Sequence, residues 1–118
     1  GDRTPLLWNV TLDDREAPGI SALLAGGEVR LGDLFRNPRG REHPLEAVPL
    51  LLLRDDEPTL TPEDDLVLRT GDELLVAGTS TGQSGLRRTL DDETMATYVI
   101  EGRHLPSGWL WRRLSGAG

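Results

Sequence analysis

The sequence predicts an α+β fold, with a small mixed or antiparallel β-sheet and two or three short helices. Short runs of aliphatic and β-branched residues recur along the chain as about five or six candidate strands, each bounded by turn residues. Between them lie stretches whose apolar residues are three or four positions apart, the spacing of a helix face. A length of 118 residues is enough for one domain with a buried core.

The first half of the chain supplies strands, helical turns and a loop. Residues 5–12 (PLLWNVTL) are apolar and β-branched, which predicts a strand. Residues 20–25 predict a short helix ended by two glycines, and 28–31 (EVRL) alternate as a strand does. LGDLFRNP predicts one helical turn ended by Pro38. The polar residues 39–44 predict a loop.

The second half begins with a strongly apolar run. Residues 48–55 are apolar on both faces and predict a buried strand. Residues 57–65 predict a connector with a short strand, and 66–68 and 73–78 predict two strands joined by a turn. Gly71 supplies the positive φ of that turn, and we expect Asp72 to bond nearby backbone amides.

The last third predicts a helix and then a strand. Residues 79–90 predict a helix capped by Ser80 or Thr81, with Leu86 and Leu90 on one face. Residues 95–100 (MATYVI) favour a strand because they are apolar, aromatic and β-branched.

Composition excludes several classes of protein. The chain has no cysteine, so it has no disulfides and no thiolate metal site. His43 and His104 lie far apart, which argues against a zinc site. The net charge of −7 disfavours nucleic-acid binding. No apolar run approaches the length of a membrane helix, so we expect this fragment itself to be soluble.

Residues 78–82 (GTSTG) match the G-x-S-x-G pattern of a serine nucleophile, between a predicted strand and a predicted helix. Asp91 or Asp92 and then His104 follow in the order of a catalytic triad. The chain is too short for an α/β-hydrolase sheet, so an ordinary strand-to-helix turn is favoured. The alternative hypothesis from another class of protein is a small serine hydrolase that uses Ser80.

The same turn is a candidate phosphate cradle, with Arg87 or Arg88 as the cation. It lacks both the G-x-G-x-x-G and the G-K-[ST] patterns, so a plain capped helix is favoured. Four acidic clusters are candidate calcium sites, and none of them follows the EF-hand pattern. Solvated loops are the favoured interpretation for the clusters at 13–16, 55–57, 63–65 and 91–93.

The C-terminal residues combine aromatic and basic side chains. Trp109 and Trp111 are followed by Arg112 and Arg113. An amphipathic segment of this kind suits a membrane surface or a protein surface. We favour protein, since two indoles bury a large apolar area. Trp109 and Trp111 are therefore interface candidates, on this domain or on a dimer mate.

Two matched segments resemble the TrkA-C or RCK-C family, the C-terminal regulatory domain of bacterial potassium channels and potassium uptake proteins. The earlier segment is Leu31, Gly32, Asp33 and Leu34, and a strand ending in Arg plus acidic residues follows it. The later segment fits L-x-x-G-D-x-L-L-V-x-G, and its matching residues are Leu68, Gly71, Asp72, Leu74, Leu75, Val76 and Gly78. The resemblance covers residues 28–90.

The resemblance implies a non-enzymatic, ligand-sensing regulatory domain in residues 1–90. It implies a homodimer, with a small ligand or nucleotide at the dimer interface as the candidate cofactor. The other partners would be a nucleotide-binding Rossmann-type domain and a transmembrane pore of the same polypeptide, at the cytoplasmic face of the cell membrane. We expect residues 91–118 to be an extension that packs on the domain or its mate. A regulatory domain of another cation transporter or antiporter is the alternative.

Overall fold

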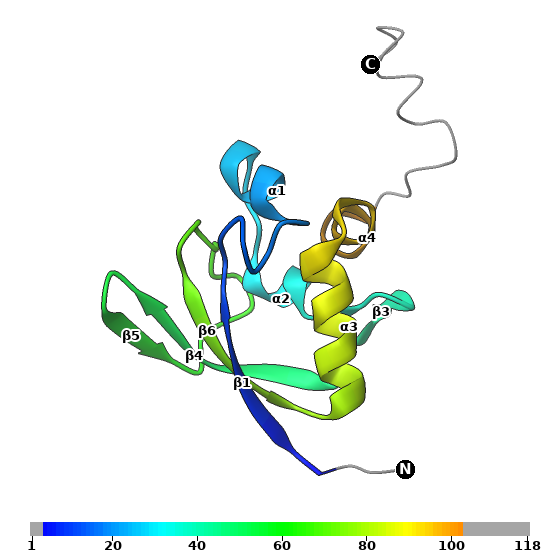
Figure 1. The fold of residues 1–118 in the computed structure, drawn as a ribbon, viewed down its shortest axis with the longest axis horizontal. Coiled ribbons are helices and arrows are strands. Elements are labelled where there is room, and N and C mark those ends of the chain that lie inside the picture. Colours follow the sequence, from blue (N-terminus) through cyan, green and yellow to red (C-terminus); the bar gives the residue numbers. More distant parts are fainter. Residues whose placement is uncertain (1–3, 103–118) are drawn as a thin grey trace, which may run out of the picture.

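The computed structural model describes residues 4–102. Four strands form an antiparallel sheet in the order β1 (Leu6–Thr11), β6 (Glu73–Gly78), β4 (Ala47–Arg54) and β5 (Glu57–Leu60). Strands β2 (Arg36–Asn37) and β3 (Gly40–Pro44) form a separate hairpin. The helices are α1 (Ser21–Gly26), α2 (Leu31–Leu34), α3 (Ser80–Asp91) and α4 (Glu93–Ala96), and a π-helical turn, η1 (Thr97–Glu101), follows them (Figure 1). The predicted α+β class is confirmed.

The four-stranded sheet has one face in the core and one face outside it. Along β6, Leu74 and Val76 are fully buried, whereas the alternate residues Leu75 and Ala77 point to the other side. Val10 of β1 and Leu52 of β4 lie on the buried face with them. Strand β4 pairs with β6 along its length but with β5 only from Leu51 onward, and the β4–β5 hairpin projects away from the helices (Figure 1).

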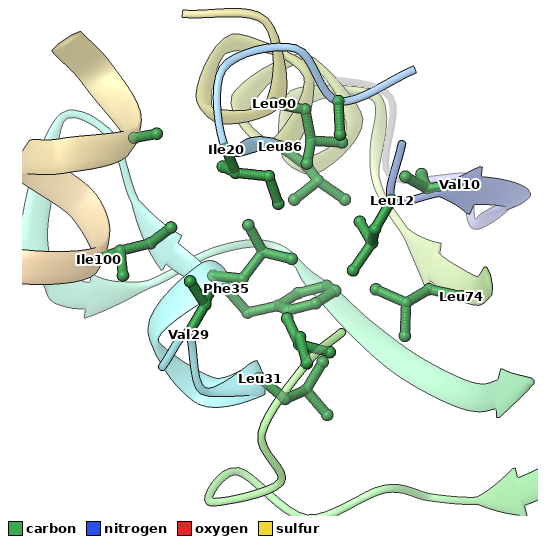
Figure 2. Packing of buried hydrophobic residues seen from close by; sticks show 14 of the residues in the cluster. Val10, Leu12, Ile20, Val29, Leu31, Phe35, Leu74, Leu86, Leu90 and Ile100 are labelled. Atoms are coloured by element: carbon green, nitrogen blue, oxygen red, sulfur yellow. The ribbon is translucent and has the colours of Figure 1, made fainter. Parts of the chain in front are cut away.

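The core fills the space between the buried sheet face and the helices. Figure 2 shows Leu86 and Leu90 of α3 directed toward Ile20 and Leu12, above Phe35 and Leu74. Helix α3 fits closely because Gly82 has no side chain, and a Cβ there would collide with the carbonyl of Glu46. The apolar face at i, i+4 predicted for this helix therefore forms one wall of the core.

Residues 95–100 are helical, so the predicted strand is wrong. Asp92 caps α4, since its Oδ1 accepts from the backbone N–H groups of Thr94 and Met95. Ala96, Val99 and Ile100 are buried at the three- and four-residue spacing of a helix. They join the same core as Leu86 and Leu90. The expected division of the chain after residue 90 stays a prediction.

Four other predictions of local structure are wrong. Residues 28–31 and 66–68 are not strands, because they cross at a single bridge between Arg30 and Val67 and then separate. Residues 39–44 are mostly strand β3 rather than loop. The cap of α3 is Thr79, whose Oγ1 accepts from the N–H of Gly82 at 3.1 Å, and neither Ser80 nor Thr81 takes that role.

Among residues 4–102, no helix combines the length and the apolar character needed to cross a membrane.

Candidate ligand-binding cleft

The turn at 69–72 has the backbone geometry that the sequence predicts. Gly71 has φ +93°, which side chains other than glycine rarely allow. The turn is bonded to the end of β1: the N–H of Gly71 donates to the carbonyl of Leu12, and the N–H of Leu12 donates to the carbonyl of Asp72, both at 2.8 Å. The Gly-Asp pair therefore holds β6 in register with β1.

Asp72 is the buried centre of a small polar network. Only 1% of the residue is exposed. Its Oδ1 accepts from Nε of Arg54 and its Oδ2 from Nη2 of Arg54, both at 2.8 Å. The backbone N–H of Arg69 donates to Oδ2 at 2.8 Å, as expected for a carboxylate that bonds turn amides. Arg54 also donates to the carbonyl of Val67 at 2.9 Å, so one side chain joins β4 to the turn.

The network fixes the charge of its arginine. The hydrogen bond to Asp72 raises the pKa of Arg54 above its usual value, and the negative charges of Asp72 and Asp55 add to this against the opposing effect of burial. The bidentate geometry is the strong form of an arginine–carboxylate pair. The pair therefore supports the fold by joining β4 to the turn.

The other residues of the later matched segment divide between packing and surface. Leu68, Leu74 and Val76 are in the core. Gly78 allows close packing, because a Cβ there would lie 2.8 Å from Cα of Ala47. Leu75 is half-buried on the sheet face outside the core. This segment explains the fold, and none of its residues lines the cleft described next.

The earlier matched segment lies at a cleft with a volume of about 540 Å³. Gly32 and Asp33 of α2 form one wall, β3 forms another, and Val48 and Pro49 of β4 form a third. The full lining is Arg30, Gly32, Asp33, Phe35, Arg36, Arg41, Glu42, His43, Pro44, Leu45, Ala47, Val48, Pro49, Asp64 and Asp65. The cleft combines apolar surface with a charged rim.

Protein groups hold the arginines of the cleft in place. Arg36 Nε donates to Asp33 Oδ1 at 2.9 Å, and its Nη1 donates to the carbonyl of Arg41 at 3.1 Å. Arg41 donates through Nε to the carbonyl of Val99, and its backbone N–H donates to the hydroxyl of Tyr98 at 3.1 Å. The hairpin is thereby tied to η1. The sequence does not predict these arginines as site residues, because Arg41 falls in the segment predicted to be a loop and Arg36 in the predicted helical turn.

A second cavity of about 390 Å³ lies beside α3 and contains Ser80. Arg39, Arg88, Thr81 and Ser84 also line it. Ser80 begins α3 and Asp91 ends it, so the two Cα atoms are separated by about 16 Å of helix axis. Asp92 is farther still along the chain, and His104 lies outside the described residues. The described residues therefore bring no acid of the proposed triad to Ser80.

Several other sequence-based candidates have structural roles, whereas Arg88 lines the cavity beside Ser80, so the phosphate cradle stays a prediction. Arg87 pairs with Asp91 at 3.1 Å, away from the start of α3. Asp13 accepts from the N–H groups of Arg15 and Glu16. Asp55 and Asp56 have positive φ in the tight turn between β4 and β5. No group of three or more His, Asp or Glu residues within 4–102 is arranged to hold a metal ion. Trp109 and Trp111 lie outside the described residues.

Comparisons with known proteins find similarity to solved structures, and two solved chains match this chain. No family model matches the chain, and no curated protein matches it. A solved chain described as "Structure of RCK domain with cda" is similar in structure, with a TM-score of 0.45 and 21% sequence identity. The alignment covers 72% of this chain and 97% of that chain.

Proposed function

We propose that the chain is a ligand-sensing regulatory domain of a bacterial potassium channel or potassium transport protein, at the cytoplasmic face of the membrane. The observation that carries the proposal is the position of the earlier matched segment. Gly32 and Asp33 line the cleft, together with Arg36 and Arg41. The residues of the resemblance are thus found at a cavity of ligand size as well as in the core.

The cleft lining is partly apolar and carries both signs of charge, with the acids Asp33, Glu42, Asp64 and Asp65 and the arginines Arg30, Arg36 and Arg41. We propose a ligand with an apolar body whose negative groups lie on the arginine side. Val48, Pro49 and Pro44 supply apolar surface, and Arg36 and Arg41 supply guanidinium groups. Arginine binds phosphate and carboxylate through paired N–H donors. A small ligand or nucleotide would meet both requirements.

The mechanism follows from the separate origins of the cleft walls. A ligand there would contact α2, the β2–β3 hairpin and the start of β4 at once. The hairpin is bonded to η1 through Tyr98 and Val99, so a shift of the hairpin moves the C-terminal helical segment. A ligand that prefers one arrangement of these elements would shift the population toward it, and the attached pore would respond.

Binding can be tested by calorimetric titration of the domain with ATP, ADP and cyclic dinucleotides built from adenine or guanine. We expect saturable binding of at least one of them, weakened at least tenfold by Arg36→Gln or Arg41→Gln because each change removes a guanidinium from the cleft, about 1.4 kcal/mol. Arg15→Gln is the matched control, since Arg15 is exposed and lies outside the cleft. Binding that survives both cleft substitutions would refute this site.

Regulation can be tested in the full-length protein, reconstituted in potassium-loaded liposomes. A ligand found by titration should change the rate of potassium efflux, and Arg36→Gln should abolish the change while leaving basal efflux intact. Equal efflux with and without the ligand, in a protein that binds it, would exclude the regulatory function.

The rival hydrolase is tested separately with a fluorophosphonate probe. The regulatory proposal expects no labelling of Ser80. Covalent labelling that Ser80→Ala removes would favour the hydrolase instead.

A further inference from the structure

The four-stranded sheet has an apolar face on the side away from the core, called here the outer face. Its central strand β6 contributes Glu73, Leu75 and Ala77. The register places Ala77 between Leu7 of β1 and Val48 of β4, which makes an apolar row across three strands. Leu75 lies in the next row and Glu73 in the row after it. The outer face is therefore apolar at one end and acidic at the other.

No element of the described chain covers this face. Three large apolar side chains are prominent on the described surface: Leu7 is 68% exposed, Val48 55% and Leu60 77%. All three lie on the outer face, since Leu60 is opposite Leu51, and Leu51 is opposite Leu75. A contiguous apolar patch rimmed by charge marks an interaction surface.

The distribution of charge along the chain indicates which segment covers the outer face. Residues 4–102 carry nineteen acidic side chains and nine arginines, a net charge of −10. Residues 103–118 carry three arginines and no acid, a net charge of +3, and Asp2 and Arg3 cancel, which accounts for the total of −7. The same C-terminal segment holds Trp109 and Trp111. Its positive charge is thus opposite to that of residues 4–102 as a whole, its two indoles match the apolar rows of the outer face, and Glu73 is the acid in those rows.

The described chain ends beside a residue of the cleft lining. A Cβ at Gly102 would lie 3.2 Å from the guanidinium of Arg41, which lines the cleft. Val48, on another wall of that cleft, belongs to the outer face. The seven residues from Gly102 to Trp109 span up to about 25 Å when extended.

We propose that the chain's own C-terminal segment lies on the outer face of the same domain. Residues 109, 111 and 113 share one side of an extended segment. The spacing of the face matches them: Trp109 reaches the row of Val48 and Ala77, Trp111 the row of Leu75, and Arg113 the row of Glu73. The inference is independent of the ligand proposed for the cleft.

Cross-linking tests the placement, because the chain contains no cysteine. In the full chain, Val48→Cys with Trp109→Cys should form a disulfide within one chain under mild oxidation. Gln83→Cys with Trp109→Cys is the control and should stay reduced, since Gln83 is exposed on α3. Disulfides that join two chains would overturn the proposal in favour of docking on a second copy. Equal cross-linking of both pairs, or of neither, would overturn it entirely.

A charge exchange tests the register without depending on full stability. Arg113→Glu should lower the yield of the Val48–Trp109 cross-link, and Arg113→Lys should preserve it. Combining Glu73→Arg with Arg113→Glu should restore the yield, because the opposite charges are again in one row. A yield that is the same in all these variants would contradict the register.

Discussion

At the scale of single residues, the Gly-Asp turn makes the most definite prediction. Gly71 has φ +93° and open space around its Cα. Gly71→Ala therefore adds backbone strain without a clash, and we expect a loss of roughly 1 kcal/mol or more in the free energy of unfolding. Gly71→Asn should lose less, since Asn tolerates positive φ better than Ala does. Urea denaturation measures both, and an unchanged midpoint for the alanine variant would contradict the turn geometry.

Substitution of Asp72 is expected to lower the free energy of unfolding by more than substitution of Gly71. Asp72→Ala leaves the guanidinium of Arg54 partly buried without its carboxylate, and it leaves the N–H of Arg69 without an acceptor. Removing one partner of a buried ion pair lowers the free energy of unfolding by about 3 kcal/mol or more. We expect the low end of that range here, because Arg54 is partly exposed. Glu57→Ala, at an exposed acid of β5, is the control. Chemical denaturation measures the free energy of unfolding of both variants. An equal loss for Asp72→Ala and Glu57→Ala would show that the network does not stabilise the fold.

At the scale of elements, the start of α3 depends on one hydroxyl. Thr79→Ala removes the acceptor of the Gly82 N–H, and we expect the free energy of unfolding to fall by about 1 kcal/mol. Ser80→Ala should have almost no effect, because Ser80 is already inside the helix. Thermal unfolding of the two variants distinguishes the caps. A larger loss for Ser80→Ala would reverse the assignment.

The sequence predicted the elements whose apolar periodicity is strong and whose ends carry clear signals. Strands β1, β4 and β6 and helix α3 were expected close to their observed bounds, and β5 lies within the segment predicted as a connector with a short strand. The prediction that residues 48–55 are buried on both faces is wrong, because Val48 is 55% exposed on the face outside the core. Strand β3 was not, because its residues Arg41, Glu42 and His43 are polar and its pairing with β2 leaves them at the surface. The residues MATYVI predict a strand by their β-propensity, whereas the spacing of the residues that become buried is helical.

The site was predictable only where it is local in sequence. Gly71 and Asp72 form a turn with their neighbours, so composition was enough to assign it. The arginine that binds Asp72 comes from another strand, 18 positions away, and the sequence alone does not pair the two. The cleft was missed for the same reason, since α2, β3 and β4 meet there only in the folded chain.

At the scale of the whole molecule, the sheet predicts a homodimer. Strands β1 and β5 are its two edges, and an unpaired edge is a template for pairing with another chain. Light scattering at micromolar concentration should give about twice the chain mass of 12.9 kDa. A chain ended after Gly102 should keep this mass if the C-terminal segment docks within its own domain. A monomer at every concentration would contradict the paired regulatory mechanism.

The pairing of β1 with β6 also sets the order in which the domain can be completed. Leu6 lies opposite Gly78, so β1 has no sheet neighbour until about 70 more residues have been synthesised, roughly 4 to 14 seconds at ribosomal speed. During that interval Val10 and Leu12 have no core to enter. Nascent chains stalled before residue 73 should therefore be readily cleaved by protease within β1, whereas chains released after α3 should resist.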